Sequence, residues 1–176
     1  SRSSISLQRN KGLKNMKKNN SFFMFLDDDI IFKKSSFIEM KKFINKNEKV
    51  YIGYGFNLIS KVNYGFLENI KKNKFIEKLG IYNTKIGKIV PSGWQTKIND
   101  VKKNQEVEWL STQAVIYANN NKKINFDNFF KGYSYLEDLD YSYRMSNFGK
   151  LIVIKKAIYY HNNNIERKSF SFGQKE

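Results

Sequence analysis

Apolar residues along the chain fall into runs and spacings that predict strands alternating with helices. The run at 22–26, the glycine-interrupted run at 50–59 and the run at 151–160 are typical of buried strands. The stretch 106–118 is expected to be a further strand, and 81–103 to be irregular. Helical spacing predicts a helix over 66–79 that closes at Gly80. Acids in a first turn and Gly149 at the end predict a helix over 137–148, and the polar stretch 6–15 could form a short helix.

One more helix is predicted from residues 36–39, whose Ser-x-x-Glu spacing is that of a capping box. This helix should run to about residue 47, with Phe37, Met40 and Ile44 on one face. Strands that alternate with helices favour an α/β fold in which helices flank a mixed sheet. We expect residues 1–176 to form a single domain.

Composition excludes several classes of site and leaves the partner open. The chain has 176 residues and no cysteine, which rules out disulfides and thiol chemistry. Lys and Arg outnumber Asp and Glu by 32 to 16, giving a net charge of +16. Such a charge suits a nucleic acid, another polyanion or an anionic membrane surface. However, nearly all these cations are lysine, whereas bidentate contacts to bases and phosphates favour arginine, so a solvated lysine-rich surface is the favoured explanation.

Three carboxylates, Asp27, Asp28 and Asp29, directly follow the predicted strand 22–26. Ligands of α/β sheets bind beyond the carboxyl ends of strands. If the strand conformation persists, Asp27 and Asp29 share one face and Asp28 lies opposite. Two oxygen ligands on one side suit Mg²⁺ or Mn²⁺, although a solvated acidic turn would have the same sequence.

A second acidic cluster, Glu137-Asp138-Leu139-Asp140, opens a predicted helix. The helix dipole alone favours acids in a first turn. Arg144 lies four residues after Asp140 and is expected to pair with it, which leaves Asp138 available as a general base.

His161, the only histidine, ends the last predicted strand and is a candidate metal ligand or diphosphate contact, although a lone histidine is often structural. Trp94 and Trp109 can stack on sugar rings, although most tryptophans belong mainly to the core.

The order of these features resembles the motifs of family 2 glycosyltransferases. The matching residues are Arg9-Asn10-Lys11-Gly12, then Asp27-Asp28-Asp29, then Glu137-Asp138-Leu139-Asp140 with Arg144, Gly149 and His161. The resemblance implies a GT-A fold and an inverting, metal-dependent transfer of a sugar from a nucleotide-sugar donor to a glycan or lipid-linked glycan. By the same resemblance, the chain is expected to lack the N-terminal part of that domain, because two of the family's strands would precede Arg9.

Carried onto this sequence, the resemblance assigns a role to each candidate residue. Asp138 would be the catalytic base with Glu137 beside it, and Trp94 and Trp109 would contact the acceptor. Asp29, Asp27 and His161 would hold Mg²⁺ or Mn²⁺. The donor would be bound by Arg9, Asn10, Asp27, Asp28 and Arg144. The family also implies a cytoplasmic enzyme, with peripheral contact to an anionic membrane as an option and no specific nucleic-acid partner. The alternative is a basic nucleic-acid or polyanion-binding module without catalysis.

Overall fold

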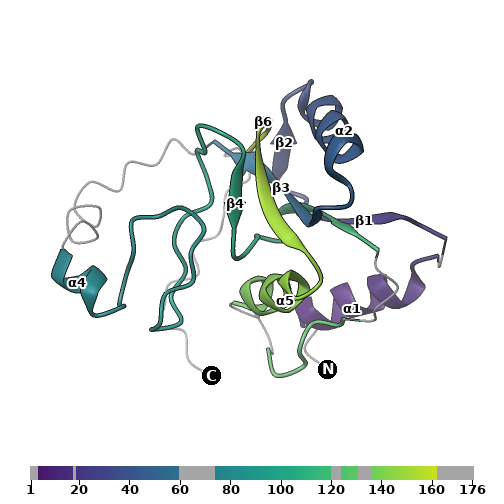
Figure 1. Cartoon of the computed structure of the whole chain (residues 1–176). Helices are drawn as coiled ribbons and strands as arrows, with labels where there is room; N and C mark the ends of the chain where they lie inside the picture. The colour runs from purple at the N-terminus through teal and green to yellow at the C-terminus, as the bar shows by residue number, and fades with distance from the viewer. Residues whose placement is uncertain (1–3, 18, 60–73, 120–123, 131–135, 162–176) are drawn as a thin grey trace.

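The computed structural model describes residues 4–17, 19–59, 74–119, 124–130 and 136–161. Strands and helices alternate along this part of the chain, as the sequence predicts (Figure 1). The helices are α1 (Ile5–Asn15), α2 (Ser36–Asn47), α4 (Lys74–Lys78) and α5 (Glu137–Ser146). The strands are β1 (Phe22–Leu26), β2 (Ile30–Phe32), β3 (Tyr51–Leu58), β4 (Gln105–Val107), β5 (Ala114–Ala118) and β6 (Lys150–His161).

The six strands form one mixed sheet: five lie in the order β1-β5-β3-β6-β2, and β4 also pairs with β6. Only β3 and β6 pair in parallel among the described strands; the other neighbours are antiparallel. Because β3 follows β6 along most of its length, β4 and β2 share the other edge of β6, with β4 at its start and β2 at its end. The α/β class expected from the sequence is therefore confirmed.

Helices cover both faces of this sheet, which explains why β3 and the first half of β6 are buried at consecutive positions. In β5, Val115 and Tyr117 face a cluster that includes Tyr141 and Met145 of α5 and the partly buried Leu13 of α1. The alternate positions of β5 face a second cluster that contains Met40 and Ile44 of α2. Figure 1 shows α1 and α5 together on one side of the sheet and α2 on the other.

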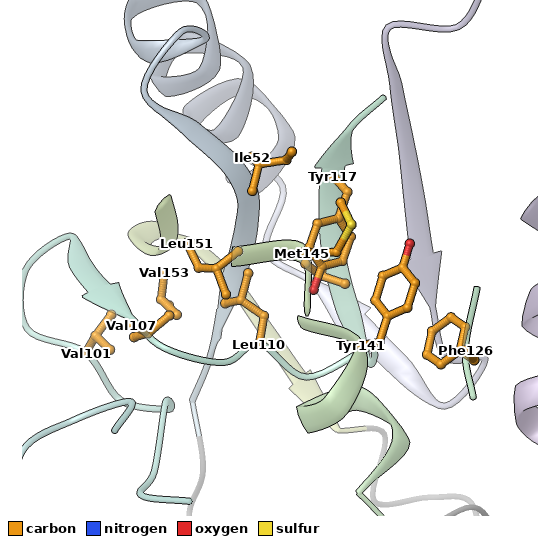
Figure 2. Packing of buried hydrophobic residues seen from close by; sticks show 11 residues of the cluster. Ile52, Val101, Val107, Leu110, Tyr117, Phe126, Tyr141, Met145, Leu151 and Val153 are labelled. Atoms are coloured by element: carbon orange, nitrogen blue, oxygen red, sulfur yellow. The ribbon is translucent and has the colours of Figure 1, made fainter. Parts of the chain in front are cut away.

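The cluster beside α5 is the larger one, and aromatic rings form much of it (Figure 2). Phe126 and Tyr141 stack with ring centroids 4.1 Å apart, and Phe25 meets both rings edge to face. Such contacts add to the free energy of burying the rings. They tie the end of β1 and the loop around Phe126 to α5, and so fix where the acidic start of α5 lies.

The predicted helices at 6–15 and 137–148 and the strands at 22–26, 50–59 and 151–160 are confirmed within about two residues. The single strand predicted over 106–118 is wrong: β4 and β5 flank an irregular segment, because they join different parts of the sheet. The short strand β2 was not predicted. Of the helix predicted over 66–79, the structure describes α4, and residues 60–73 lie outside the described residues.

The capping box predicted at the start of α2 is also wrong. Ser35 is the N-cap, and neither it nor another side chain makes a capping hydrogen bond. Ser36 is buried, and its hydroxyl donates to the carbonyl of Ile158 (2.6 Å) and accepts from the Ile158 amide (3.0 Å). The hydroxyl satisfies the backbone where the pairing of β3 and β6 shifts register. Met40 and Ile44 are buried as predicted, whereas Phe37 is 48% exposed at the margin of that face.

None of the helices in the described segments is long and apolar enough to cross a membrane.

Candidate functional site

A cavity of about 750 Å³ is lined by residues from distant parts of the chain. Its charged lining contains the predicted site residues Arg9 of α1, Asp27 after β1, and Glu137 and Asp138 at the start of α5. Alternation along β1 explains part of this convergence. Phe23 and Phe25 face the α1–α5 side of the sheet, so Asp27, two residues further on, points to the same side.

Arg9 lies between the two acidic clusters. Its Nη1 binds the carboxylate of Glu137, and its Nη2 lies 3.7 Å from Oδ1 of Asp27. The guanidinium also sits 5.4 Å from the centre of the Phe126 ring, a cation–π distance. The Arg9 and Glu137 side chains are only 16% and 10% exposed. One buried cation therefore compensates carboxylates that are more than a hundred residues apart in the sequence.

Asp138 lines the cavity beside this pair. Its Oδ1 accepts a hydrogen bond from the Leu139 amide (2.8 Å), which fixes the carboxylate at the N-terminus of α5. Burial raises the pKa of Asp138, while the Leu139 amide, the charge of Arg9 and a hydrogen bond from Ser111 oppose that rise. A carboxylate with a raised pKa is a stronger base than an exposed one.

The other two carboxyl groups of the cavity are shifted in the same direction. Burial raises the pKa of Asp27, with Arg9 opposing the rise. Burial and the charge of Asp138 raise the pKa of Glu137, again against Arg9. Residues whose pKa values are shifted by burial and by a specific charged partner gather at functional sites.

Asp29 and His161 meet beside the cavity, at the ends of β1 and β6. Oδ2 of Asp29 lies 3.8 Å from Nδ1 of His161, and the charges of both groups act on Asp27. The His161 Nδ1 atom is buried and makes no hydrogen bond within the described structure. Across the described ranges, no three His, Cys, Asp or Glu side chains are arranged to hold a metal ion. Any ion bound here would need ligands from a substrate or from water.

Aromatic and polar side chains complete the cavity lining. Trp109 is 8% exposed, and its indole N–H donates to the Thr96 carbonyl (3.0 Å), so it serves mainly as wall. Trp94 is 52% exposed and follows a tight turn in which the Val90 amide donates to the Trp94 carbonyl (2.9 Å). The two tryptophans thus differ: Trp94 keeps an exposed ring at the cavity, and Trp109 is mainly a buried wall residue, while their acceptor contacts stay predictions.

Several predicted residues do not line the cavity. The side chain of Asn10 instead binds the backbone of Phe126. Its Nδ2 donates to the Phe126 carbonyl (2.9 Å), and its Oδ1 accepts from the Phe126 amide (2.7 Å). Arg144 binds Asp140 through Nε (3.0 Å) and Nη2, as the four-residue spacing predicts. Asp28 is exposed, in a turn that follows β1, so the strand conformation does not persist through the acidic cluster. Asn10 and Arg144 therefore make structural contacts away from the cavity lining, and their expected donor contacts stay predictions.

Some cavity residues had no signal in the sequence. Ser111 and Gln113 lie in the segment that was predicted to be continuous strand, yet Ser111 bonds Asp138 and Gln113 accepts from the Tyr159 hydroxyl (3.1 Å). Lys97 brings a further cation to the lining. The irregular segments 94–99 and 109–114 supply much of the wall, and only the folded chain shows that they meet.

No protein-family model, curated protein or solved structure matches this chain. The chemistry must therefore be argued from the cavity. The cavity is lined by a buried carboxylate with a raised pKa and by an exposed indole ring, and a second acidic group pairs with a histidine outside that lining. This set can bind a hydroxylated ligand and remove a proton from it.

Proposed function

We propose that this cavity is the active site of an inverting, metal-dependent glycosyltransferase of the GT-A fold, which moves a sugar from a nucleotide-sugar donor to a hydroxyl of a glycan or lipid-linked glycan. The observation that carries the proposal is that Asp27 and Glu137–Asp138 line one cavity with Arg9 between them. These acidic clusters occur in the order that family 2 glycosyltransferases use.

Asp138 is the proposed general base. It would take the proton of the acceptor hydroxyl while that oxygen attacks the anomeric carbon, on the side opposite the departing diphosphate. Burial raises the pKa of Asp138, which strengthens it as a base at neutral pH. The hydrogen bond from the Leu139 amide holds the carboxylate in one orientation.

Asp29 and His161, with Asp27 beside them, are the groups that would hold Mg²⁺ or Mn²⁺. The buried His161 Nδ1 atom without a hydrogen-bond partner among the described residues fits a nitrogen ligand. Two protein ligands suffice when substrate phosphate and water fill the other positions, which is common for Mg²⁺. When bound, the ion would offset the charge that develops on the departing diphosphate.

Glu137 and Arg9 act as a positioning pair in this proposal. The pair anchors the start of α5, and so Asp138, to α1. Because Glu137 is paired with Arg9, Asp138 is the carboxylate at the start of α5 that can accept a proton. A polyanion-binding module fits less well, because the carboxylates of the cavity would repel a nucleic acid backbone.

The direct test is turnover by the full chain with a panel of nucleotide sugars, glycan and lipid-linked acceptors, and Mn²⁺. Replacing Asp138 by Asn should lower kcat by about 10²- to 10⁴-fold, the usual contribution of a general base. Asp140→Asn is the matched control, because it removes a carboxylate from the same helix that already pairs with Arg144; it should change kcat less than about threefold.

Two results would contradict the proposal. Full activity in Asp138→Asn would remove this residue as the base. Failure of the folded wild-type chain to bind any nucleotide diphosphate with Mn²⁺, measured by titration calorimetry, would remove the proposed donor site itself.

A further inference from the structure

The outer face of α2 carries a continuous row of exposed residues. Ser36, Met40 and Ile44 are buried against the sheet, so the opposite side of this helix faces outward. Residues on that side recur at helical spacing and are all exposed: Ile38, Lys41, Lys42, Asn45 and Lys49. We call this row the α2 basic face.

Two exposed apolar side chains lie in the first turn of α2. Ile38 is 58% exposed on the α2 basic face; Phe37, beside it, is 48% exposed, and its ring also packs against Phe32 and Phe56. The exposed Lys33 and Lys34 lie between the preceding strand and α2. Isolated exposed apolar residues are ordinary, whereas a group of them surrounded by lysines is characteristic of a membrane-binding surface.

The charge of this region is strongly positive. Between residues 31 and 49 there are six lysines and two glutamates, and all six lysines are exposed. One of them, Lys42, lies 3.5 Å from Glu39. An anionic surface would therefore meet a lysine-rich face with an apolar end.

We propose that the α2 basic face binds an anionic lipid bilayer, with Phe37 and Ile38 inserted among the lipid headgroups. The lysine ammonium groups attract anionic headgroups as point charges. The apolar end gains free energy only where it can leave water, which a bilayer interface offers and a nucleic acid backbone does not. This inference does not depend on the function proposed for the cavity.

The first experiment measures sedimentation of the full chain with vesicles of phosphatidylcholine, with and without phosphatidylserine. The wild type should bind the mixed vesicles and not pure phosphatidylcholine. Lys41→Glu/Lys49→Glu should lower the affinity for mixed vesicles by at least about tenfold. The matched control is Lys102→Glu/Lys103→Glu, which makes the same change of net charge at two exposed lysines elsewhere; it should change the affinity less than about threefold.

Equal losses in the two double variants would overturn the proposal, because binding would then follow net charge alone. The proposal also fails if the wild type binds neither kind of vesicle. A third result would overturn it in favour of nucleic acid: Lys41→Glu/Lys49→Glu loses affinity for single-stranded DNA and keeps its vesicle binding. Circular dichroism verifies that each variant remains folded.

The second experiment tests insertion of the apolar end. Ile38→Trp should be quenched by brominated phosphatidylcholine mixed with phosphatidylserine. Leu7→Trp is the matched control, because Leu7 is 52% exposed on α1, away from α2. The increase in quenching over the wild type, which carries Trp94 and Trp109, should be confined to Ile38→Trp. Equal quenching of both variants, or none in either, would contradict insertion at α2.

Discussion

Replacing Arg9 by Met removes the one guanidinium that joins the acidic clusters of the cavity. Methionine keeps an unbranched apolar stem against Phe126 and removes the charge. Glu137 would then be a buried carboxylate without its ion-pair partner, and Asp27 would lose a cation 3.7 Å away. The expected result is a large loss of stability, because a buried carboxylate without compensation is costly.

The size of this loss follows from the burial of the pair. Breaking a buried ion pair by removing one partner costs about 3–5 kcal/mol. The Arg9 and Glu137 side chains retain 16% and 10% of their exposure, so the lower end of the range applies. Loss of the cation–π contact with Phe126 adds about 0.5 kcal/mol. Arg9→Met should therefore lower the free energy of unfolding by about 3.5 kcal/mol at pH 7.

The loss should also depend on pH with a definite sign. Burial already raises the pKa of Glu137, and Arg9 partly holds it down, so removing Arg9 raises the pKa further. A carboxyl group whose pKa is higher in the folded protein than in the unfolded chain stabilises the fold at low pH. That contribution is lost as the pH rises through the folded-state pKa. The deficit of Arg9→Met should therefore shrink as the pH falls from 7 towards 4.5, the ordinary pKa of Glu.

Urea unfolding followed by circular dichroism at several pH values measures this effect. Arg144→Met is the matched control: its pair with Asp140 is about a third exposed, so its loss should cost only about 0.5 kcal/mol. Adding Glu137→Gln to Arg9→Met should recover at least half of the loss. A deficit equal to that of Arg144→Met, or one that does not change with pH, would refute the reasoning.

Three further predictions concern the cavity and its frame. Asp138→Asn should raise the free energy of unfolding at pH 7, because burial raises the pKa of Asp138; the gain should disappear in urea titrations as the pH falls through that pKa. Gly87→Ala should cost about 2 kcal/mol or more, since its φ is +68° and a Cβ there would lie 2.2 Å from Cγ1 of Val107, whereas Gly12→Ala in open space on α1 should gain about 0.5 kcal/mol. Trp94→Ala should leave the melting temperature nearly unchanged and raise KM for a glycan acceptor, as measured by initial rates.

Elements with strong local signals could be predicted from the sequence. The run 22–26 has no polar residue and forms the half-buried edge strand β1, so the apolar pattern is sufficient to predict the strand. The break between β4 and β5 could not be predicted, because Trp109 and Leu110 continue an apolar pattern while packing as a crossing segment. The capping box predicted at Ser36 was wrong for a similar reason. Its sequence context fits a helix cap, but its hydroxyl bonds the backbone of Ile158, 122 residues away.

The charged part of the candidate site could be predicted better than its walls. Adjacent acidic residues at a strand end and a helix start are visible in the sequence, and they do meet at one cavity. The sequence could not show that the neighbours Arg9 and Asn10 have different partners. Their directions on α1 bring Arg9 to Glu137 and Asn10 to the backbone of Phe126. Ser111 and Thr96 are ordinary residues in irregular segments, and long-range packing alone gives them their contacts.

The connection from β4 to β5 has a consequence for how the site can change. It starts at the outer edge of β6 and ends beyond β3, so it must pass over both strands. Leu110 fills the space above Gly53 and Gly55, where an added Cβ would lie 3.0 Å and 2.6 Å from its methyl groups. Leu110 thus packs the middle of the β4–β5 connection tightly against the sheet, and an insertion there would disturb this packing. The turn that carries Trp94 is closed by its own hydrogen bonds. A change of ligand preference should therefore come from replacing the turn that carries Trp94, while the β4–β5 connection keeps its length.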